Sequence, residues 1–367
     1  MKNSNLFVVN KYWLSFFLIK VFYLFFGVLV YSKMTTLGDT SRWMSGTIKL
    51  PDLIDVLTFS TAMLDFLGGL SSYLFGTLLG NFPFMLLAFY GIYYSVSKLI
   101  LTNKQLIFIL ALLSFPSFGV WSSVAGKEAV GVFYMGVILG YIIDLINRKR
   151  FGLKLIEIFS IYLLLIFKPQ FSIAIFSLIL YIVLANKLNL KSSGKVLLLI
   201  IQFAFGGVGL WVFKDAINEI SFTIPAHFSL DAGSTRENTM WLNDYDIFLN
   251  APYGMFIGFF GPTFSEVMNK PIQGIAFLES FVLVCLFFYM LAKHLMQSLL
   301  TSKINIYITA LLFIGVFWIL FAHYPFGALN AGSALRYRTN FYAFLIVFIF
   351  CLYQRAGYKR SIASLNY

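Results

Sequence analysis

Two arginines one residue apart, Arg336 and Arg338, open the last long apolar segment of the chain. Mostly small residues precede them, from Asn330 to Leu335, and small residues let backbone approach a ligand closely. Planar guanidinium groups bind phosphate oxygens in a bidentate manner. The pair, with Tyr337 between its members, therefore indicates a binding site for phosphate or diphosphate. The alternative is that both arginines hold lipid headgroups or loop carboxylates.

Two lysines stand in similar positions, each beside the expected start of an apolar helix. Lys127 lies with Glu128 in the short segment Ser122–Ala129, and Lys168 lies in Lys168–Gln170. The partial positive charge at a helix N-terminus favours anions, so a phosphate there would be stabilised by the lysine and by free amides. The simpler interpretations are a solvated hairpin turn and a lysine that snorkels to the membrane surface.

Four side chains are candidates for the general base of a transfer reaction, namely Asp39, Glu128, Glu237 and His323. Such a base takes the proton of an attacking hydroxyl group, which carboxylates and imidazoles do in enzymes. Asp39 and Glu128 are the leading candidates because they lie nearest to expected helix ends. Arg42 follows Asp39 closely and adds a cation. Asp39 also has a structural alternative, because aspartate caps the free amides of helix starts.

A polar stretch further along the chain combines a cation, carboxylates and an aromatic ring. It contains Arg236, Glu237, Trp241 and the run Asp244–Asp246. An aromatic ring stacks on the apolar face of a sugar and carboxylates accept its hydroxyl protons, so this stretch favours carbohydrate binding. The alternative is a solvated acidic loop with a buried tryptophan. No HExxH or CxxC spacing occurs, so no metal site is predicted, and no cofactor is expected.

The composition places these residues in a membrane protein. The chain has 367 residues, of which 60% are hydrophobic and 11% charged, whereas about a quarter of a soluble domain is charged. This excludes a disordered chain, a nucleic-acid-binding domain and an ordinary soluble enzyme. The net charge of +12 taken alone would suit nucleic acid or anionic lipid, but the positions of the charges favour a membrane topology.

The apolar runs predict an all-α fold, a polytopic transmembrane helix bundle that forms a single integral-membrane domain over residues 1–367. The run at 155–167 and the run at 170–186 are short, and we treat them as two helices joined by a tight turn. A single kinked helix there would invert the topology downstream. In all, ten spans are expected, at about 12–31, 81–100, 105–121, 130–147, 155–167, 170–186, 196–213, 273–292, 304–323 and 339–353.

The lysines and arginines orient the expected bundle. With the N-terminus in the cytoplasm, 16 of the 27 lysines and arginines but only two of the 15 acids fall on the inner side, as the positive-inside rule requires. Both termini are then cytoplasmic, and Lys20 lies within the first span. The candidate residues above all fall on the outer side.

Two long outer loops are expected, at about 32–80 and 214–272. They contain apolar patches, such as Phe66–Leu70 and Tyr253–Pro262, that are too short to span. These patches are expected to form short interfacial helices against the membrane face. Ordinary packing within a loop domain is the alternative. Loops of this length are uncommon unless they have a function.

Four features together resemble Wzy-type O-antigen and capsular polysaccharide polymerases. They are the Gly126–Glu128 turn, the Gly38–Asp39 pair in the first outer loop, the large late outer loop and the segment Asn330–Arg338. The resemblance covers nearly the whole chain as topology but only short segments as motif. These polymerases are bacterial inner-membrane enzymes, close to the lipid-dependent glycosyltransferases of GT-C architecture. The resemblance implies transfer of a growing glycan from undecaprenyl pyrophosphate to an incoming lipid-linked repeat unit, at the periplasmic face.

Residue roles follow from the resemblance. Arg336 and Arg338 would clamp the pyrophosphate, and Arg236 would be a third cation from the large loop, although the chain lacks a second arginine-rich outer loop. Catalysis must neutralise the developing diphosphate charge, for which Lys127 and Lys168 are further candidates. The expected partners are undecaprenyl-pyrophosphate-linked oligosaccharide, the lipid bilayer and a chain-length regulator, and nucleic acid is not among them.

Other functions remain open from the sequence. One is a GT-C-like enzyme that adds a single sugar from a polyprenyl-phosphate donor, and another is a flippase or transporter for a lipid-linked oligosaccharide. Transporters usually have inverted repeats and polar groups near the middle of the membrane, whereas the ionisable residues here gather at one face. A membrane acyltransferase ranks lower, because the histidine it would need, His323, lies at the outer end.

Overall fold

The computed structural model describes residues 10–35, 37–46, 52–226, 228, 234–301 and 305–363, apart from the side chains of 272, 297–301 and 356–363. The fold is helical, with 81% of residues in helices and no strand in these ranges. One isolated antiparallel bridge joins Thr235 to Asn330. Among the described residues, eight helices are long and apolar enough to cross a membrane. The predicted fold class, a helical membrane bundle, is confirmed at this level.

Seven of these eight helices coincide with predicted spans, and the eighth, α5, falls in the predicted first outer loop. The helices are α1 (Lys11–Phe26, continued by the π-helix η1, Gly27–Tyr31, and by α2, Ser32–Met34), α5 (Ser60–Leu79), α9 (Lys127–Ile146), α11 (Ser172–Lys187, after the 3-10 turn η2, Pro169–Phe171), α12 (Ser192–Val212), α17 (Gly274–Thr301), α18 (Ile306–Gly327) and α19 (Ala331–Ala363).

The other three predicted spans form shorter helices. Two of them are α6 (Phe82–Val96) and α10 (Leu155–Phe167). The expectation of one helix over 105–121 is wrong, because the segment divides into α7 (Asn103–Leu112) and α8 (Pro116–Trp121). Proline cannot donate the backbone hydrogen bond of a helix interior and forces the preceding residue out of helical geometry. The number of spans remains a prediction.

The turn predicted at Lys168 is confirmed. Lys168 has φ −148° and ψ 63°, which are not helical values, and it separates α10 from η2 and α11. The competing interpretation of one kinked helix is therefore excluded by the backbone. Lys168 is left at the junction between two helices, where its side chain can reach a third.

Helix α9 forms the core of the bundle. Every residue of α9 after Lys127 is buried, and the helix packs against α6, α10 and α19. A Cβ atom built at Gly136 would overlap the backbone of Gly91 on α6. Small residues that let two backbones meet are the usual basis of helix packing in membranes. The start of α9, which carries Lys127 and Glu128, is therefore rigidly placed.

The elements of the two predicted outer loops are helical. The first contains α3 (Thr40–Trp43), α4 (Leu53–Thr58) and α5, and the second contains α13 (Lys214–Ala226), α14 (Asp246–Leu249), α15 (Ala251–Phe260), α16 (Phe264–Asn269) and the 3-10 turn η3 (Pro271–Gln273). The expectation of a short helix is wrong for Phe66–Leu70, which lies within α5, a helix of 20 residues that is long and apolar enough to cross a membrane. The patch Tyr253–Pro262 contributes most of the ten-residue helix α15.

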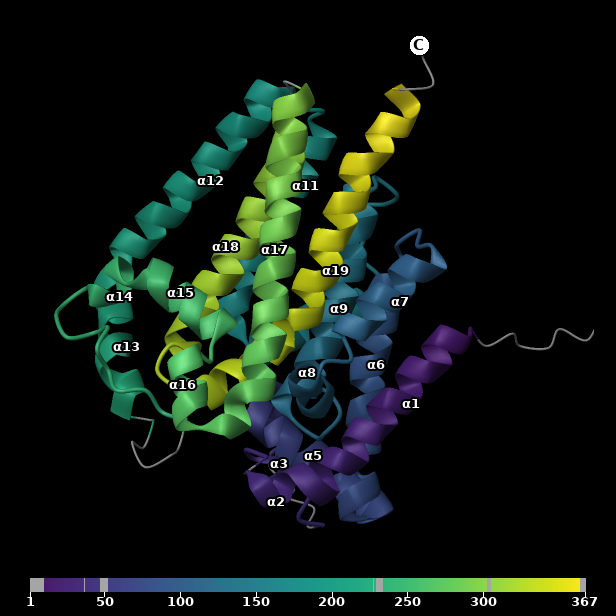
Figure 1. The fold of residues 1–367 in the computed structure, drawn as a ribbon, viewed down its shortest axis with the longest axis vertical. Helices are drawn as coiled ribbons and strands as arrows, with labels where there is room; N and C mark the ends of the chain where they lie inside the picture. Colours follow the sequence, from purple (N-terminus) through teal and green to yellow (C-terminus); the bar gives the residue numbers. More distant parts are fainter. Residues whose placement is uncertain are drawn as a thin grey trace, which may run out of the picture.

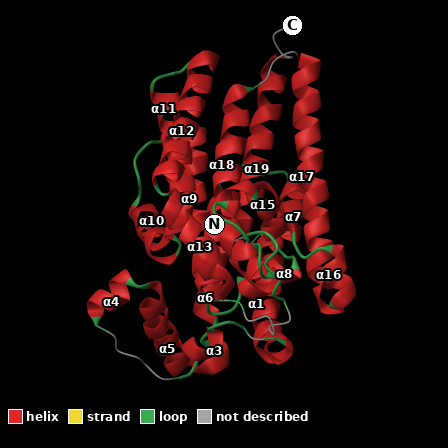
Figure 2. Ribbon diagram, turned by 90° about the vertical axis from the view of Figure 1, so that its left-hand side faces the viewer, coloured by secondary structure: helices red, strands yellow, loops and turns green. Residues whose placement is uncertain are grey.

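The loop helices gather at one end of the molecule. In Figure 1, α2, α3, α5 and α16 lie at the end opposite to the C-terminal end of α19. Figure 2 shows α3, α4 and α5 together below the long helices. We call this end the loop end. It corresponds to the side that the sequence assigns to the outer face.

Candidate functional site

A residue of the second predicted outer loop, Ser234, is hydrogen-bonded to the segment that precedes α19. The two predicted arginines lie in the first turns of this helix. The side-chain oxygen of Asn330 accepts hydrogen bonds from the backbone N–H of Ser333 at 2.8 Å and from the hydroxyl of Ser234 at 3.1 Å. Successive residues of an α-helix are about 100° apart around its axis, so Arg336 and Arg338 leave α19 from nearly opposite faces. The structure therefore does not bring the predicted arginine pair to one site.

Arg336 lies in a cluster of charged residues from three elements. Its Nε donates to Oε1 of Glu128 at 2.8 Å, and its guanidinium lies 3.8 Å from Oδ2 of Asp39. The ring of Trp121 stacks on the guanidinium at 5.4 Å. Glu128 is only 1% exposed, whereas the Asp39 side chain is 53% exposed. Glu128 therefore holds Arg336 in place, and Asp39 is the carboxylate that a ligand can reach.

A glycine makes room for Arg336. Gly38 has φ +57°, a left-handed conformation that costs residues with a Cβ atom about 1–2 kcal/mol. A Cβ built there would overlap the guanidinium of Arg336. The next segment is fixed to the α8–α9 turn, because the Thr40 hydroxyl donates to the carbonyl of Ala125 at 2.8 Å. The Gly38–Asp39 pair is thus placed against α19 by its backbone.

Two lysines join this cluster without a carboxylate partner. Nζ of Lys168 lies 4.3 Å from the centre of the Tyr337 ring, and Nζ of Lys127 donates to the hydroxyl of Thr61 at 2.9 Å. In the described part of the chain, no carboxylate oxygen lies within 4.0 Å of either ammonium group. We call Lys127, Lys168, Arg336, Glu128 and Asp39 the cation cluster.

The electrostatics of the cation cluster favour an anion. Burial lowers the pKa of Lys168 to about 8, an effect that Glu128 opposes and that Lys127 and Arg336 reinforce. These charges are therefore near enough to act on one another. Three cations face two carboxylates, one of which is engaged by Arg336, so a bound anion would relieve the repulsion between the cations.

Charges at the other end of α9 are arranged differently. There the buried carboxylate of Asp144 is paired with Lys98 at 2.9 Å and with Arg150 at 3.0 Å. Arg150 also binds Glu157, which in turn accepts a hydrogen bond from Tyr94 at 2.7 Å. Each group in this network is compensated by another, so the network braces helices and leaves no charge for a ligand.

Arg338 is buried and fully engaged by protein groups. It is 2% exposed, and its guanidinium donates to the carbonyl of Phe259 and to the hydroxyl of Ser280, both at 2.9 Å. It lies 3.5 Å from Glu279, which also accepts the backbone N–H of Ser117 at 2.9 Å. Arg338 therefore ties α8, α15, α17 and α19 together and has no contact in this structure with the cation cluster.

Glu279 is not among the residues predicted from the sequence. An acidic residue inside an apolar run is costly in a membrane and signals a partner or a function, and Glu279 lies within the predicted span 273–292. That signal was available. The identity of the partner was not, because Arg338 is far away in the sequence.

The candidates of the second loop are held away from the cation cluster. Arg236 binds Glu266 through two hydrogen bonds, at 2.7 and 3.2 Å, and donates to the carbonyl of Ala328 at 2.7 Å. Although burial raises the pKa of Glu266, hydrogen bonds from Arg236 and Thr263 lower it below its ordinary value. Arg236 thus anchors the loop to the α18–α19 connection. Glu237, beside it, is exposed.

Trp241 is not available as a stacking platform in this structure. It is 3% exposed, and its indole Nε1 donates to the hydroxyl of Tyr324 at 2.7 Å. Trp241 is therefore a buried tryptophan within the loop, as in the alternative stated for this stretch of sequence.

His323 is buried as well, with Nε2 at 3.0 Å from the carbonyl oxygen of Gly258 and no hydrogen-bond partner for Nδ1 in the described structure. Arg42 forms two hydrogen bonds, both at 2.9 Å, with Asp65 on α5.

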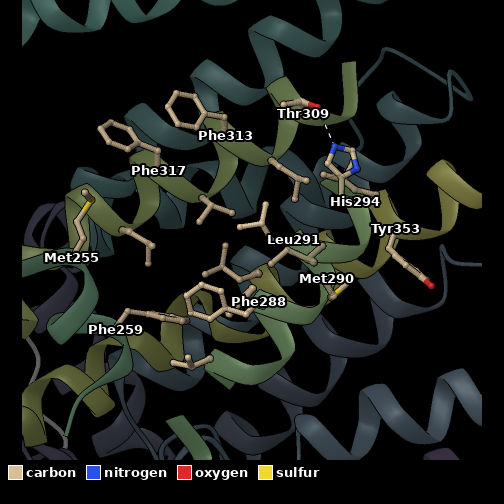
Figure 3. Close-up of a pocket in the computed structure, with 18 of the residues that line it drawn as sticks. Met255, Phe259, Phe288, Met290, Leu291, His294, Thr309, Phe313, Phe317 and Tyr353 are labelled. Carbon is tan, nitrogen blue, oxygen red and sulfur yellow. Dashed lines mark hydrogen bonds between the residues drawn. The ribbon is translucent and has the colours of Figure 1, made fainter. Parts of the chain in front are cut away.

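A large apolar cavity lies between α15, α17, α18 and α19. Its volume is about 700 Å³, and its lining consists almost entirely of aliphatic and aromatic side chains. Figure 3 shows it extending from Met255, in the second loop, to His294 in the C-terminal part of α17 and Tyr353 in the C-terminal part of α19. The ring of Phe259 lines this cavity, while its backbone carbonyl accepts the hydrogen bond from Arg338. On α19 itself the lining residues are Leu345, Ile349, Leu352 and Tyr353, which lie beyond the turns that carry Arg336 and Arg338.

The fold and site define a multi-pass helical membrane protein with a cation cluster at its loop end. In the described ranges, no group of three or more histidine, cysteine, aspartate or glutamate residues is placed to hold a metal ion. Comparisons of the chain with protein-family models, curated proteins and solved structures found no match.

Proposed function

We propose that this protein is a membrane glycosyltransferase of the polysaccharide polymerase type. It would transfer a glycan from undecaprenyl pyrophosphate to an incoming lipid-linked repeat unit. The observation that carries the proposal is the cation cluster, in which Lys127 and Lys168 have no carboxylate partner among the described residues. Phosphate oxygens are the natural ligands of such a group.

The apolar cavity supports the lipid part of the substrate. A polyprenyl chain is a long flexible hydrocarbon, and a cavity of about 700 Å³ lined by apolar side chains would hold part of it. On α19 the cavity lies on the face of Arg338, opposite to that of Arg336, so the proposal requires the lipid to pass the start of α19, with its diphosphate in the cation cluster and its tail in the cavity.

The proposed reaction uses these groups as follows. A hydroxyl oxygen of the acceptor sugar attacks the anomeric carbon of the donor, and the bond from that carbon to the diphosphate oxygen breaks. The diphosphate leaves with the electron pair, and Arg336, Lys127 and Lys168 stabilise its charge. Asp39 takes the hydroxyl proton, because its carboxylate is half exposed and lies 3.8 Å from Arg336 without a close hydrogen bond to it.

The proposal assigns narrower roles than the sequence did. Glu128 orients Arg336, and Arg338 is a positioning residue that acts through Glu279 and the carbonyl of Phe259. Arg236 anchors the second loop. The place of the reaction, the periplasmic face of a bacterial inner membrane, belongs to the proposal too. Its test is accessibility labelling of a cysteine placed at Ser333, beside the start of α19.

The direct experiment is polymerisation in proteoliposomes. Undecaprenyl-pyrophosphate-linked repeat units are supplied, and products are separated by size. Wild type should give a ladder, Arg336→Lys should shorten or abolish it, and the control Lys104→Met, at the start of α7 outside the cation cluster, should leave it unchanged. A single added sugar would replace the proposal with a monosaccharide transferase. Movement of lipid between leaflets without new glycosidic bonds would replace it with a flippase.

A further inference from the structure

A second cavity, polar in character, adjoins the cation cluster. Its volume is about 460 Å³, and it lies where α4, α5 and the end of α10 meet. Its polar lining consists of two carboxylates and three hydroxyl groups, from Asp55, Asp65, Thr58, Ser60 and Thr61. Cavities of roughly 300–1,000 Å³ are typical of small-molecule sites. We call it the polar pocket.

One hydrogen bond joins the polar pocket to the cation cluster, and two further lining residues lie near it. The hydroxyl of Thr61, in the lining, accepts the hydrogen bond from Lys127 at 2.9 Å. Asp65, also in the lining, binds Arg42 on α3, the helix that follows Asp39. Ile166 completes the lining two residues before Lys168. A ligand in the polar pocket would therefore lie beside whatever the cation cluster binds.

The charge of the polar pocket selects the chemistry of its ligand. Arg42 compensates Asp65, but no lysine or arginine in the described part of the chain lies within 4.0 Å of the Asp55 carboxylate. A phosphate would be repelled there. A carboxylate offers only acceptors and a hydroxyl side chain offers both a donor and acceptors, which together match the many hydroxyl groups of an uncharged sugar. The exposed ring of Phe59 at the rim would cover the apolar face of that sugar.

We propose that the polar pocket binds an uncharged, hydroxyl-rich sugar ring next to the diphosphate, with Asp55 as the principal hydroxyl acceptor. This inference rests on the proposed function, because a sugar beside a diphosphate is the acceptor or donor sugar of the same transfer. It divides the loop end into two binding regions of opposite character. Cations bind the leaving group, and carboxylates bind the glycan.

The test measures the two regions separately on the purified full-length protein in nanodiscs. The probes are inorganic pyrophosphate, whose binding is measured by isothermal titration, and a panel of methyl glycosides of neutral hexoses and N-acetylhexosamines, whose binding is measured by saturation-transfer NMR. Asp55→Asn and Phe59→Ala should each weaken binding of the preferred glycoside at least tenfold and leave pyrophosphate binding within twofold. The control Asp52→Asn, an exposed residue just before α4 and outside the lining, should change neither.

The outcomes separate this inference from the proposed function. If no methyl glycoside binds, or if Asp55→Asn and Phe59→Ala bind glycosides as wild type does, the polar pocket is not a sugar site. In either case pyrophosphate binding that depends on Arg336 would still support the diphosphate site. The converse result has two parts. Asp55→Asn loses glycoside binding, and Arg336→Lys leaves pyrophosphate binding unaffected. That result would support the polar pocket as a sugar site and overturn the proposed function.

Discussion

The pairing of Arg336 with Glu128 gives the sharpest prediction, because it separates stability from activity. Glu128 is 1% exposed and the Arg336 side chain is 18% exposed, so solvent screens their 2.8 Å hydrogen bond only weakly. Replacing the arginine alone by methionine would leave a buried carboxylate without a partner. Removal of one member of a buried ion pair costs about 3–5 kcal/mol. We expect Arg336→Met to lose stability of that order.

Two further variants isolate the chemical role from this structural one. The double variant Arg336→Met with Glu128→Gln should recover most of the lost stability, because no uncompensated charge remains buried. Its transfer rate should still fall about 10²–10³-fold, the usual effect of removing one group that stabilises transition-state charge. Arg336→Lys should keep the fold and lose at least about tenfold in rate, since a point charge cannot reproduce the guanidinium fork.

Two measurements on the same preparations decide the outcome. Thermal unfolding in detergent reports stability, and the initial rate of chain elongation in proteoliposomes reports activity. A double variant that is as stable and as active as wild type would refute the reasoning, because Arg336 would then be only a structural partner of Glu128. A double variant as unstable as Arg336→Met would show that the buried charge is not the cause of the loss.

Three further predictions test the environment of the site. Pyrophosphate affinity, measured by isothermal titration, should be highest below pH 8 and fall as the pH rises through about 8, where Lys168 loses its proton; Lys168→Arg should move this fall to higher pH. Gly38→Ala should lower both stability and activity, because its new Cβ would meet the Arg336 guanidinium. The control Gly46→Ala is also at positive φ but has open space around it, so it should lower stability alone, by about 1–2 kcal/mol. Melting curves and elongation assays measure the two effects. Arg338→Met should reduce the melting temperature strongly and a second change, Glu279→Gln, should restore much of it, whereas a diphosphate clamp at Arg338 would instead appear as lost pyrophosphate binding at unchanged stability.

The sequence determined the class of fold. Apolar runs of about 20 residues have few structural options in a membrane other than helices, and seven of the eight long apolar helices of the described chain were found in this way. Local chemistry also located the break at Lys168. The failure at 105–121 came from reading hydropathy without Pro116, whose effect on backbone is equally local.

The position of α5 was harder to predict. Its residues include glycines and serines within an apolar pattern, and hydropathy alone did not distinguish such a helix from a loop. Part of its apolar surface packs against α3 and α4, whereas Tyr73, Leu74 and Phe75 are exposed. The polar pocket could not have been predicted either, because its two carboxylates and three hydroxyl groups become a cavity only when α4, α5 and α10 meet.

Within the candidate site, the sequence found the charged residues and the tertiary structure selected among them. Arg336 and Arg338 are nearly identical as sequence features, yet one stands beside two lysines without carboxylate partners and the other is buried against Glu279. The physical reason is that Arg336, although paired with Glu128, keeps 18% of its side chain exposed next to two further cations, whereas Arg338 is 2% exposed and surrounded by protein groups. Compensation depends on partners far away in the chain, which helix packing brings within a few ångströms.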